Sequence, residues 1–237
     1  VFGSSNYGFG GLYRSTNGGS NWSLMSSTPN IMGWSATGSG SGGQAWYDLS
    51  IACDPLNENT IYVGGVNIWK STNGGSNWSI VGHWYGAGSI PYVHADHHHA
   101  AFRPGTSQLY VGTDGGVYKS SNGGTSWSHL NDGMNITQYY KISQSTSDTN
   151  VVLAGAQDNG SHLKGSASWS EVTGGDGMDN GVDVNNDNVM YTSIYYGDFY
   201  KSTNGGSFFS SINTLSPAGS GNWVTPFKCD PVNSNVI

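Results

Sequence analysis

The chain has 237 residues, of which 10% are charged and 37 are glycine, and its formal net charge is −7. This negative balance excludes the basic stripe with which nucleic-acid binders displace counterions, and it disfavours anionic lipid surfaces. No run approaches the roughly 18 apolar residues of a membrane-spanning helix, so no membrane insertion is expected. Much glycine, 9 Trp and 14 Tyr favour short strands and tight turns over helices.

One sequence motif recurs along the chain. S-T-N-G-G-S-N-W-S occupies residues 15–23 and again 71–79, and shorter variants occupy 120–127 and 202–209. Repeats of about 20 to 50 residues are typical of propellers and solenoids. Four-stranded antiparallel units that repeat at this length stack radially. The sequence therefore predicts an all-β fold, a β-propeller with about five blades' worth of chain.

Each repeat predicts four strands, with the motif forming the hairpin between the third and the fourth. The predicted strands are 45–53, 60–65, 68–71 and 78–81; 93–102, 108–113, 117–120 and 127–130; 138–144 and 151–156, followed by a degenerate hairpin at 165–169; and 179–184, 189–194, 199–202 and 208–212. Residues 223–229 open a fifth blade that residues 1–24 complete. We expect one propeller domain, or part of one, over 1–237, with blades at 45–92, 93–135, 136–177 and 178–221, and with 222–237 and 1–44 as a partial or shared blade.

The repeated motif has a structural explanation in each of its residues. Ser15 and Asn17 are side chains that bond backbone N–H groups of turns. Gly18 and Gly19 supply positive φ without a Cβ clash. Trp22 is expected to fold back over the turn as a buried ring. The motif therefore indicates scaffold and not a ligand site.

The motif resembles the Asp-box of bacterial neuraminidase-type repeats, sortilin-type ectodomains and xyloglucanase-type glycoside hydrolases, with Asn in place of the usual Asp. The runs Y-V-H-A-D-H-H-H-A-A-F-R-P and L-Y-V-G-T-D-G-G-V-Y-K-S are also similar to secreted bacterial propellers. This resemblance implies a secreted or cell-surface propeller flanked by further domains. The box residues would be Ser15, Asn17, Gly19, Trp22, Ser71, Asn73, Gly75, Trp78, Ser120, Asn122, Gly124, Trp127, Ser202, Asn204, Gly206 and Phe209.

Two segments between blades, 32–44 and 82–92, are longer than the other connections. Propellers commonly bind ligands through such loops on one face. The second loop carries Trp84, Tyr85 and Tyr92. These three aromatic residues are candidates for binding a glycan or a protein.

The densest polar cluster is H-A-D-H-H-H at 94–99. On a strand alternate residues share a face, so His94, Asp96 and His98 are expected to point one way. Three such side chains are candidate ligands of a divalent ion or of a bound molecule. The alternative is a polar strand that lines the propeller channel, and no metal and no cofactor are expected in that case.

Asp114 in T-D-G-G and Asp158 in Q-D-N-G are the candidate catalytic carboxylates. Glycoside hydrolysis needs one carboxylic acid and one base or nucleophile across the sugar. Asp114 resembles the base of xyloglucanase-type enzymes, although one residue between the Asp and the Gly pair is missing. Both sequences also fit ordinary hairpin turns.

A sialidase is excluded, because those enzymes clamp the substrate carboxylate with three arginines and this chain holds only Arg14 and Arg103. Cys53 and Cys229 stand in matching C-D-P contexts and are expected to be small buried thiols.

Three hypotheses follow. The first is a non-catalytic propeller that serves as a binding or spacer module. The second is a xyloglucanase-like hydrolase fragment that uses Asp114 and Asp158 on a β-glucan. The third is a receptor-like propeller stiffened by a metal on the strand from His94 to His98.

Overall fold

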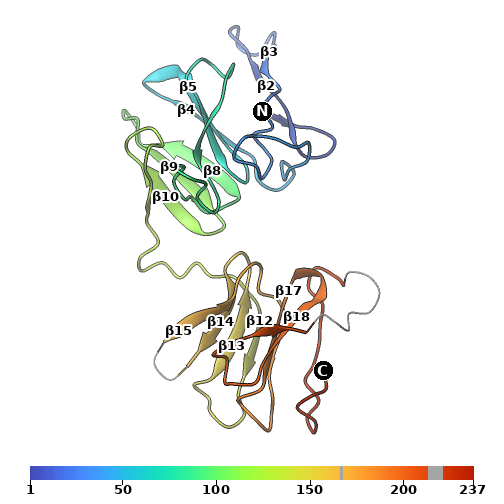
Figure 1. Cartoon of the computed structure of the whole chain (residues 1–237). Helices are drawn as coiled ribbons and strands as arrows, with labels where there is room; N and C mark the ends of the chain where they lie inside the picture. Colours follow the sequence, from blue (N-terminus) through green and yellow to red (C-terminus); the bar gives the residue numbers. More distant parts are fainter. Residues whose placement is uncertain (166–167, 213–220) are drawn as a thin grey trace. The chain divides into compact units, whose positions relative to one another are not determined.

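A computed structural model describes residues 1–165, 168–212 and 221–237, and these residues are almost entirely strands and loops (Figure 1). The one helical element in that part of the chain is the 3₁₀ turn η1, Tyr195–Gly197. None of the described helices is long and apolar enough to cross a bilayer. The all-β fold class is confirmed. The chain forms two compact units, Val1–Ile136 and Thr137–Ile237.

The first unit contains three antiparallel sheets, each built from strands consecutive in the sequence. A three-stranded sheet holds β1 (Phe2–Gly3), β2 (Phe9–Arg14) and β3 (Ser23–Ser26). The next holds β4 (Ser50–Asp54), β5 (Asn57–Gly64), β6 (Ile68–Ser71) and β7 (Ser79–Gly82). The last holds β8 (His97–Phe102), β9 (Leu109–Thr113), β10 (Gly116–Ser120) and β11 (Ser128–His129).

The second unit contains two four-stranded antiparallel sheets. One holds β12 (Tyr139–Gln144), β13 (Val152–Ala156), β14 (Gly160–Lys164) and β15 (Trp169–Thr173). The other holds β16 (Asn180–Val182), β17 (Met190–Ile194), β18 (Asp198–Ser202) and β19 (Ser210–Ser211). Four sheets of four strands and one of three are the blades of a partial propeller. Residues 166–167 of the predicted degenerate hairpin lie outside the described residues. The predicted blade boundary at 221 lies next to residues 213–220, which are also outside them.

Blades pack face to face, and β5 shows how the sequence achieves this. Residues 60–64 of β5 are buried on both faces of the sheet. Ile61 and Val63 pack with Phe9 and Leu12 of the preceding sheet. Tyr62 points to the opposite face and packs with Leu109 and Val111 of the following sheet. Because successive side chains alternate across a strand, one apolar run supplies two cores. The first strands β4 and β8 lie next to each other.

The four S-x-N-G-G hairpins are structural turns, as predicted. In the copy at 71–75 the Ser71 hydroxyl accepts the N–H of Gly75 at 2.9 Å and donates to Asn73 Oδ1 at 3.0 Å. Asn73 Oδ1 also accepts the N–H of Asn77. Both glycines have positive φ, 70° at Gly74 and 91° at Gly75. The copies at 15, 120 and 202 repeat the bond from the second glycine to the serine hydroxyl.

In three of the four hairpins the aromatic residue packs on the preceding blade. Trp78 Nε1 donates to Ser26 Oγ on β3, and Trp127 Nε1 donates to the carbonyl of Val81 on β7. Phe209 is buried among residues that include Leu163. The prediction of a buried Trp22 is wrong, since its ring is 63% exposed. Trp22 belongs to the first sheet, and no sheet precedes that one within its unit.

Three predicted strands differ from the structure. The strand predicted at 45–53 begins only at Ser50, because Tyr47 and Asp48 bond back to the Gln44 carbonyl in a turn. The strand predicted at 93–102 begins at His97. Residues 223–229 form no strand. Phe227 donates its N–H to the Asp179 side chain and not to a strand backbone, so no ladder forms there.

The expectation of buried cysteines is wrong for Cys53, which is exposed on β4, whereas Cys229 is partly buried. Cys53 lies on the edge strand of its sheet, where one face is open to solvent. Both thiols are free.

Candidate functional site

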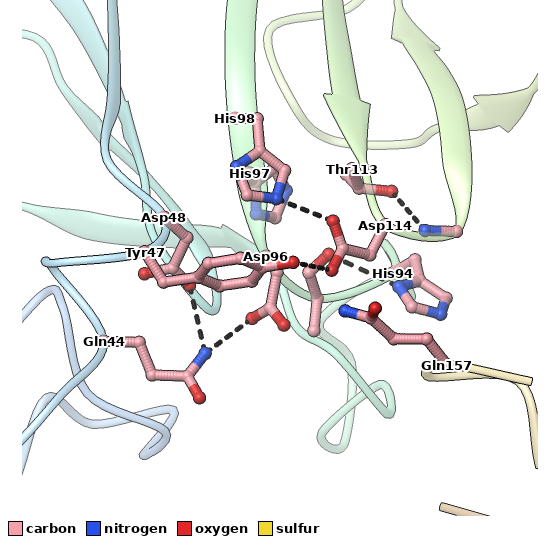
Figure 2. A network of polar contacts seen from close by, with 12 residues as sticks. Gln44, Tyr47, Asp48, His94, Asp96, His97, His98, Thr113, Asp114 and Gln157 are labelled. Carbon is pink, nitrogen blue, oxygen red and sulfur yellow. Dashed lines mark hydrogen bonds and ion pairs between the residues drawn. The ribbon is translucent and has the colours of Figure 1, made fainter. Parts of the chain in front are cut away.

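Two carboxyl groups of the first unit stand just before adjacent first strands. Asp48 precedes β4 by two residues, and Asp96 immediately precedes β8. Asp96 has φ of 64°, in the left-handed region that non-glycine residues rarely occupy. Residues held in such conformations concentrate at functional sites. The ends of β4 and β8 therefore form a candidate site (Figure 2).

The carboxyls of Asp48 and Asp96 are buried, with 0% and 8% of their surface exposed, and are hydrogen-bonded to each other. Gln44 Nε2 bridges them, at 2.9 Å from Asp96 Oδ1 and 3.4 Å from Asp48 Oδ2. Burial, followed by the neighbouring Asp96 charge, raises the pKa of Asp48 to about 9. Burial also raises the pKa of Asp96. At neutral pH Asp48 is therefore the protonated member and donates to Asp96.

Asp114 lies in the turn between β9 and β10, as its T-D-G-G sequence predicts, and it also faces this acidic pair. Its carboxylate accepts hydrogen bonds from Tyr47 Oη and His98 Nε2, each at 2.6 Å (Figure 2). A carboxylate oxygen of Asp114 lies within 4.8 Å of one of Asp96. Asp114 is therefore both a turn residue and a member of the polar cluster.

The structure brings His94 and His98 close enough to Asp96 to act on its charge, but not through the regular strand that was predicted. The left-handed conformation of Asp96 breaks the strand before β8 begins, and a bulge lies between His97 and His99. His94 packs under Gly115, where a Cβ would approach its ring to 2.1 Å. The alternation expected of a regular strand therefore does not apply.

His97 is a core residue. Its side chain is fully buried, and Nδ1 lies 2.8 Å from the carbonyl of Gly65. Burial lowers the pKa of His97 to about 4, so the ring is neutral and Nδ1–H donates to that carbonyl. A Cβ at Gly64 would lie 2.5 Å from His97 Cβ, so this glycine permits the close packing of β5 on β8.

A row of aromatic rings leads to the polar cluster. The ring centroids of Tyr7 and Trp46 lie 6.4 Å apart, those of Trp46 and Tyr47 5.5 Å, and those of Tyr47 and His98 4.8 Å. Tyr7, Trp46 and Tyr47 are 52%, 70% and 37% exposed. Tyr7, like Asp96, has a left-handed backbone, with φ of 63°. We call Tyr7, Trp46 and Tyr47 the aromatic row.

The aromatic row, Gln44 and Asp48 are not among the site residues that the sequence predicts. The signal available was the compact run Q-A-W-Y-D at 44–48, in which two adjacent aromatic residues stand between a glutamine and an aspartate. The prediction of a strand over 45–53 separated these residues, because neighbouring side chains of a strand point to opposite faces.

The candidate aromatic residues of the second loop are exposed, as a binding role requires. Trp84 and Tyr85 form an edge-to-face pair with centroids 4.7 Å apart. Tyr92 packs against Tyr118 instead. Asn67, which is buried, holds both long loops, because its Nδ2 donates to the carbonyls of Gly33 and Trp34 and its Oδ1 accepts the N–H of Trp84.

Asp158 belongs to the second unit, at the turn between β13 and β14, where its φ is 55°. Its backbone N–H donates to Asp176 Oδ1 at 3.0 Å. The pairing of Asp114 with Asp158 for catalysis stays a prediction.

No model of a known protein family matches the sequence, and no curated protein matches it. Among solved structures the chain is similar to the GH74 enzyme of Niastella koreensis, with 19% identity over 85% of this chain and 34% of that one and a TM-score of 0.38. It is also similar to the GH74 xyloglucanase of Xanthomonas campestris, with 17% identity over 78% and 34% of the two chains and a TM-score of 0.34.

A third similar structure is YCF48 from Cyanidioschyzon merolae, with 16% identity over 86% of this chain and 67% of that one and a TM-score of 0.31. The chain spans about a third of the length of the two GH74 enzymes.

Proposed function

We propose that this chain is a non-catalytic binding module of a secreted or cell-surface propeller protein, and that it holds a glycan on the aromatic row of the first unit. The observation that carries the proposal is the continuous exposed row of Tyr7, Trp46 and Tyr47, which ends at the polar cluster. Exposed apolar groups rimmed by polar residues mark interaction sites. Aromatic faces supply contact area, and a few fixed polar groups supply orientation.

The hairpins support the wider assignment. Their Ser, Asn and paired glycines make the same bonds in each copy, which is the behaviour expected of Asp-box turns with Asn in the acidic position. The resemblance to Asp-box propellers also supports export from the cell, further flanking domains, and a protein ligand as the alternative to a glycan.

A binding assay with matched variants tests this function. We expect the protein to be retarded in native gels that contain soluble β-glucans, and Trp46→Ala to abolish the retardation. Trp22→Ala is the control, because Trp22 is similarly exposed, at 63% against 70% for Trp46, but lies on a hairpin of the first sheet. Loss of binding in Trp22→Ala alone, or no retardation by any glycan, would contradict the proposal.

A second candidate function is glycoside hydrolysis. It is favoured by the carboxylates of Asp96 and Asp114, whose oxygens lie within 4.8 Å, close to the roughly 5 Å separation in retaining enzymes. Release of reducing ends from xyloglucan, lost in Asp114→Asn and in Asp96→Asn, would favour this candidate. Release that persists in Asp114→Asn would remove Asp114 from the reaction.

A further inference from the structure

The aromatic row ends at a group of three carboxyls, those of Asp114, Asp96 and Asp48. Tyr47 joins the two features, because its ring packs against His98 at 4.8 Å and its hydroxyl donates to Asp114 at 2.6 Å. Behind Asp114 lie the buried carboxyls of Asp96 and Asp48. A ligand stacked on Trp46 and Tyr47 would thus place one of its polar groups at the mouth of this cluster.

The buried part of the cluster is short of hydrogen-bond donors and positive charge. Asp48 is fully buried, and its Oδ1 is among the buried side-chain atoms that have no hydrogen-bond partner in the described chain. The groups near Asp96 that can carry a positive charge are the imidazoles of His94 and His98. The charged groups of Arg14 and Lys70 are engaged elsewhere, with Glu58 and with the carbonyl of Gly123.

Access to the cluster is open on the side of the aromatic row. The side chains of His98 and Asp114 are 39% and 14% exposed. Tyr47 borders this side of the cluster, with its hydroxyl against the carboxylate of Asp114 (Figure 2). We call this exposed edge of His98 and Asp114 the opening of the cluster.

A protonated primary amine fits this opening better than a hydroxyl. An ammonium group has three donors and no acceptor, whereas a hydroxyl has one donor. Hydrogen bonds from a charged donor to a carboxylate are about twice as strong as neutral ones. An ammonium group also gains from the faces of Trp and Tyr rings within about 6 Å.

We propose that the ligand of the aromatic row is an amino-sugar polymer, a β-linked glucosamine chain, whose ammonium group is received by Asp114 and, behind it, Asp96. This inference rests on the proposed glycan-binding function and names the class of glycan. It separates that class from neutral β-glucans and from N-acetylated chains, which share the ring shape but lack the charge.

Calorimetric titration of the whole chain with three β-1,4-linked hexamers, of glucose, N-acetylglucosamine and glucosamine, tests the inference. The buffer is mildly acidic, so that the sugar amine carries its proton, and contains a chelator, so that no divalent ion bridges the carboxylates. We expect the glucosamine hexamer to bind about tenfold more tightly than the other two, the size of one charged hydrogen bond. Asp114→Asn and Asp96→Asn should each remove this preference.

The control is Asp132→Asn, which removes one carboxylate of the same unit from a side chain that is 98% exposed. It should leave the preference unchanged, because only the overall charge differs. Equal loss in Asp132→Asn and Asp114→Asn would show that the net charge of −7 attracts the polycation without a site, and would overturn the inference. Equal affinities for the three hexamers, all lost in Trp46→Ala, would overturn the inference but leave glycan binding standing. Binding of no hexamer would overturn both.

Discussion

The side-chain amide of Gln44 donates to Oδ1 of Asp96 at 2.9 Å, and this bond connects the loop before β4 to the residue that immediately precedes β8. Gln44 also reaches Asp48 at 3.4 Å. One neutral side chain thereby organises two buried carboxyls from neighbouring blades. The arrangement has consequences for stability that can be measured apart from any ligand.

Asp48→Asn should flatten the pH dependence of stability on the alkaline side. The pKa of Asp48 is raised to about 9, above the value of about 4 expected when the chain is unfolded. The native state therefore holds the extra proton between these values, and the free energy of unfolding of the wild type falls as pH rises through this window. Urea unfolding from pH of about 5 to 9 measures the slope. Equal slopes for wild type and variant would show that Asp48 is ionised in the native state.

His97→Asn should flatten the pH dependence of stability on the acidic side. The pKa of buried His97 is lowered to about 4 from about 6.5, so the unfolded chain binds the extra proton between these values. The wild type should lose about 3 kcal/mol of stability as pH falls across that window. The asparagine amide can replace Nδ1 as donor to Gly65 but does not titrate, so the loss should shrink. His129→Asn, at an exposed histidine, should keep the wild-type pH profile.

Gly75→Ala should destabilise the first unit more than Gly18→Ala does. Both glycines occupy hairpins at positive φ, 91° and 64°, so each alanine is strained by about 1 kcal/mol. At Gly75 the added Cβ would also lie 1.9 Å from Leu12 Cδ2, whereas at Gly18 it meets nothing within 4 Å. The extra cost of overpacking is about 1 to 3 kcal/mol. Equal midpoints of urea unfolding for the two variants would contradict the packing of this hairpin on the preceding blade.

Asn67→Ala should loosen both long loops of the first unit. The substitution removes two donors to the carbonyls of Gly33 and Trp34 and the acceptor for Trp84, and each buried group left unpaired costs about 1 to 3 kcal/mol. Hydrogen exchange measured by mass spectrometry should show faster exchange in residues 31–44 and 83–92. Asn131→Ala removes a comparable side-chain bridge, to Gly115 and Val117, and should leave those loops protected. Unchanged exchange in Asn67→Ala would show that Asn67 does not hold them.

The blade pattern could be predicted because it depends on local chemistry. The side chains of Ser71 and Asn73 make their hairpin bonds within residues 71–77, and alternation along β5 follows from the geometry of a strand. The first residues of β4 and β8 were harder to predict. A turn at 44–48 and the left-handed conformation of Asp96 delay these strands, although the sequences there would also allow an extended backbone. The exposure of Trp22 depends on whether another blade covers its ring, and a local sequence pattern does not predict that.

The sequence by itself determined that this chain folds into repeated four-stranded blades, since the glycine pairs and the alternating apolar residues permit little else. Only the tertiary structure decided which polar residues meet. Asp48, Asp96 and Asp114 lie far apart in sequence, and their proximity arises because β4, β8 and the β9–β10 turn converge when the blades pack. Burial then raises the pKa values of Asp48 and Asp96, and burial is a property of the packed blades and not of any segment alone.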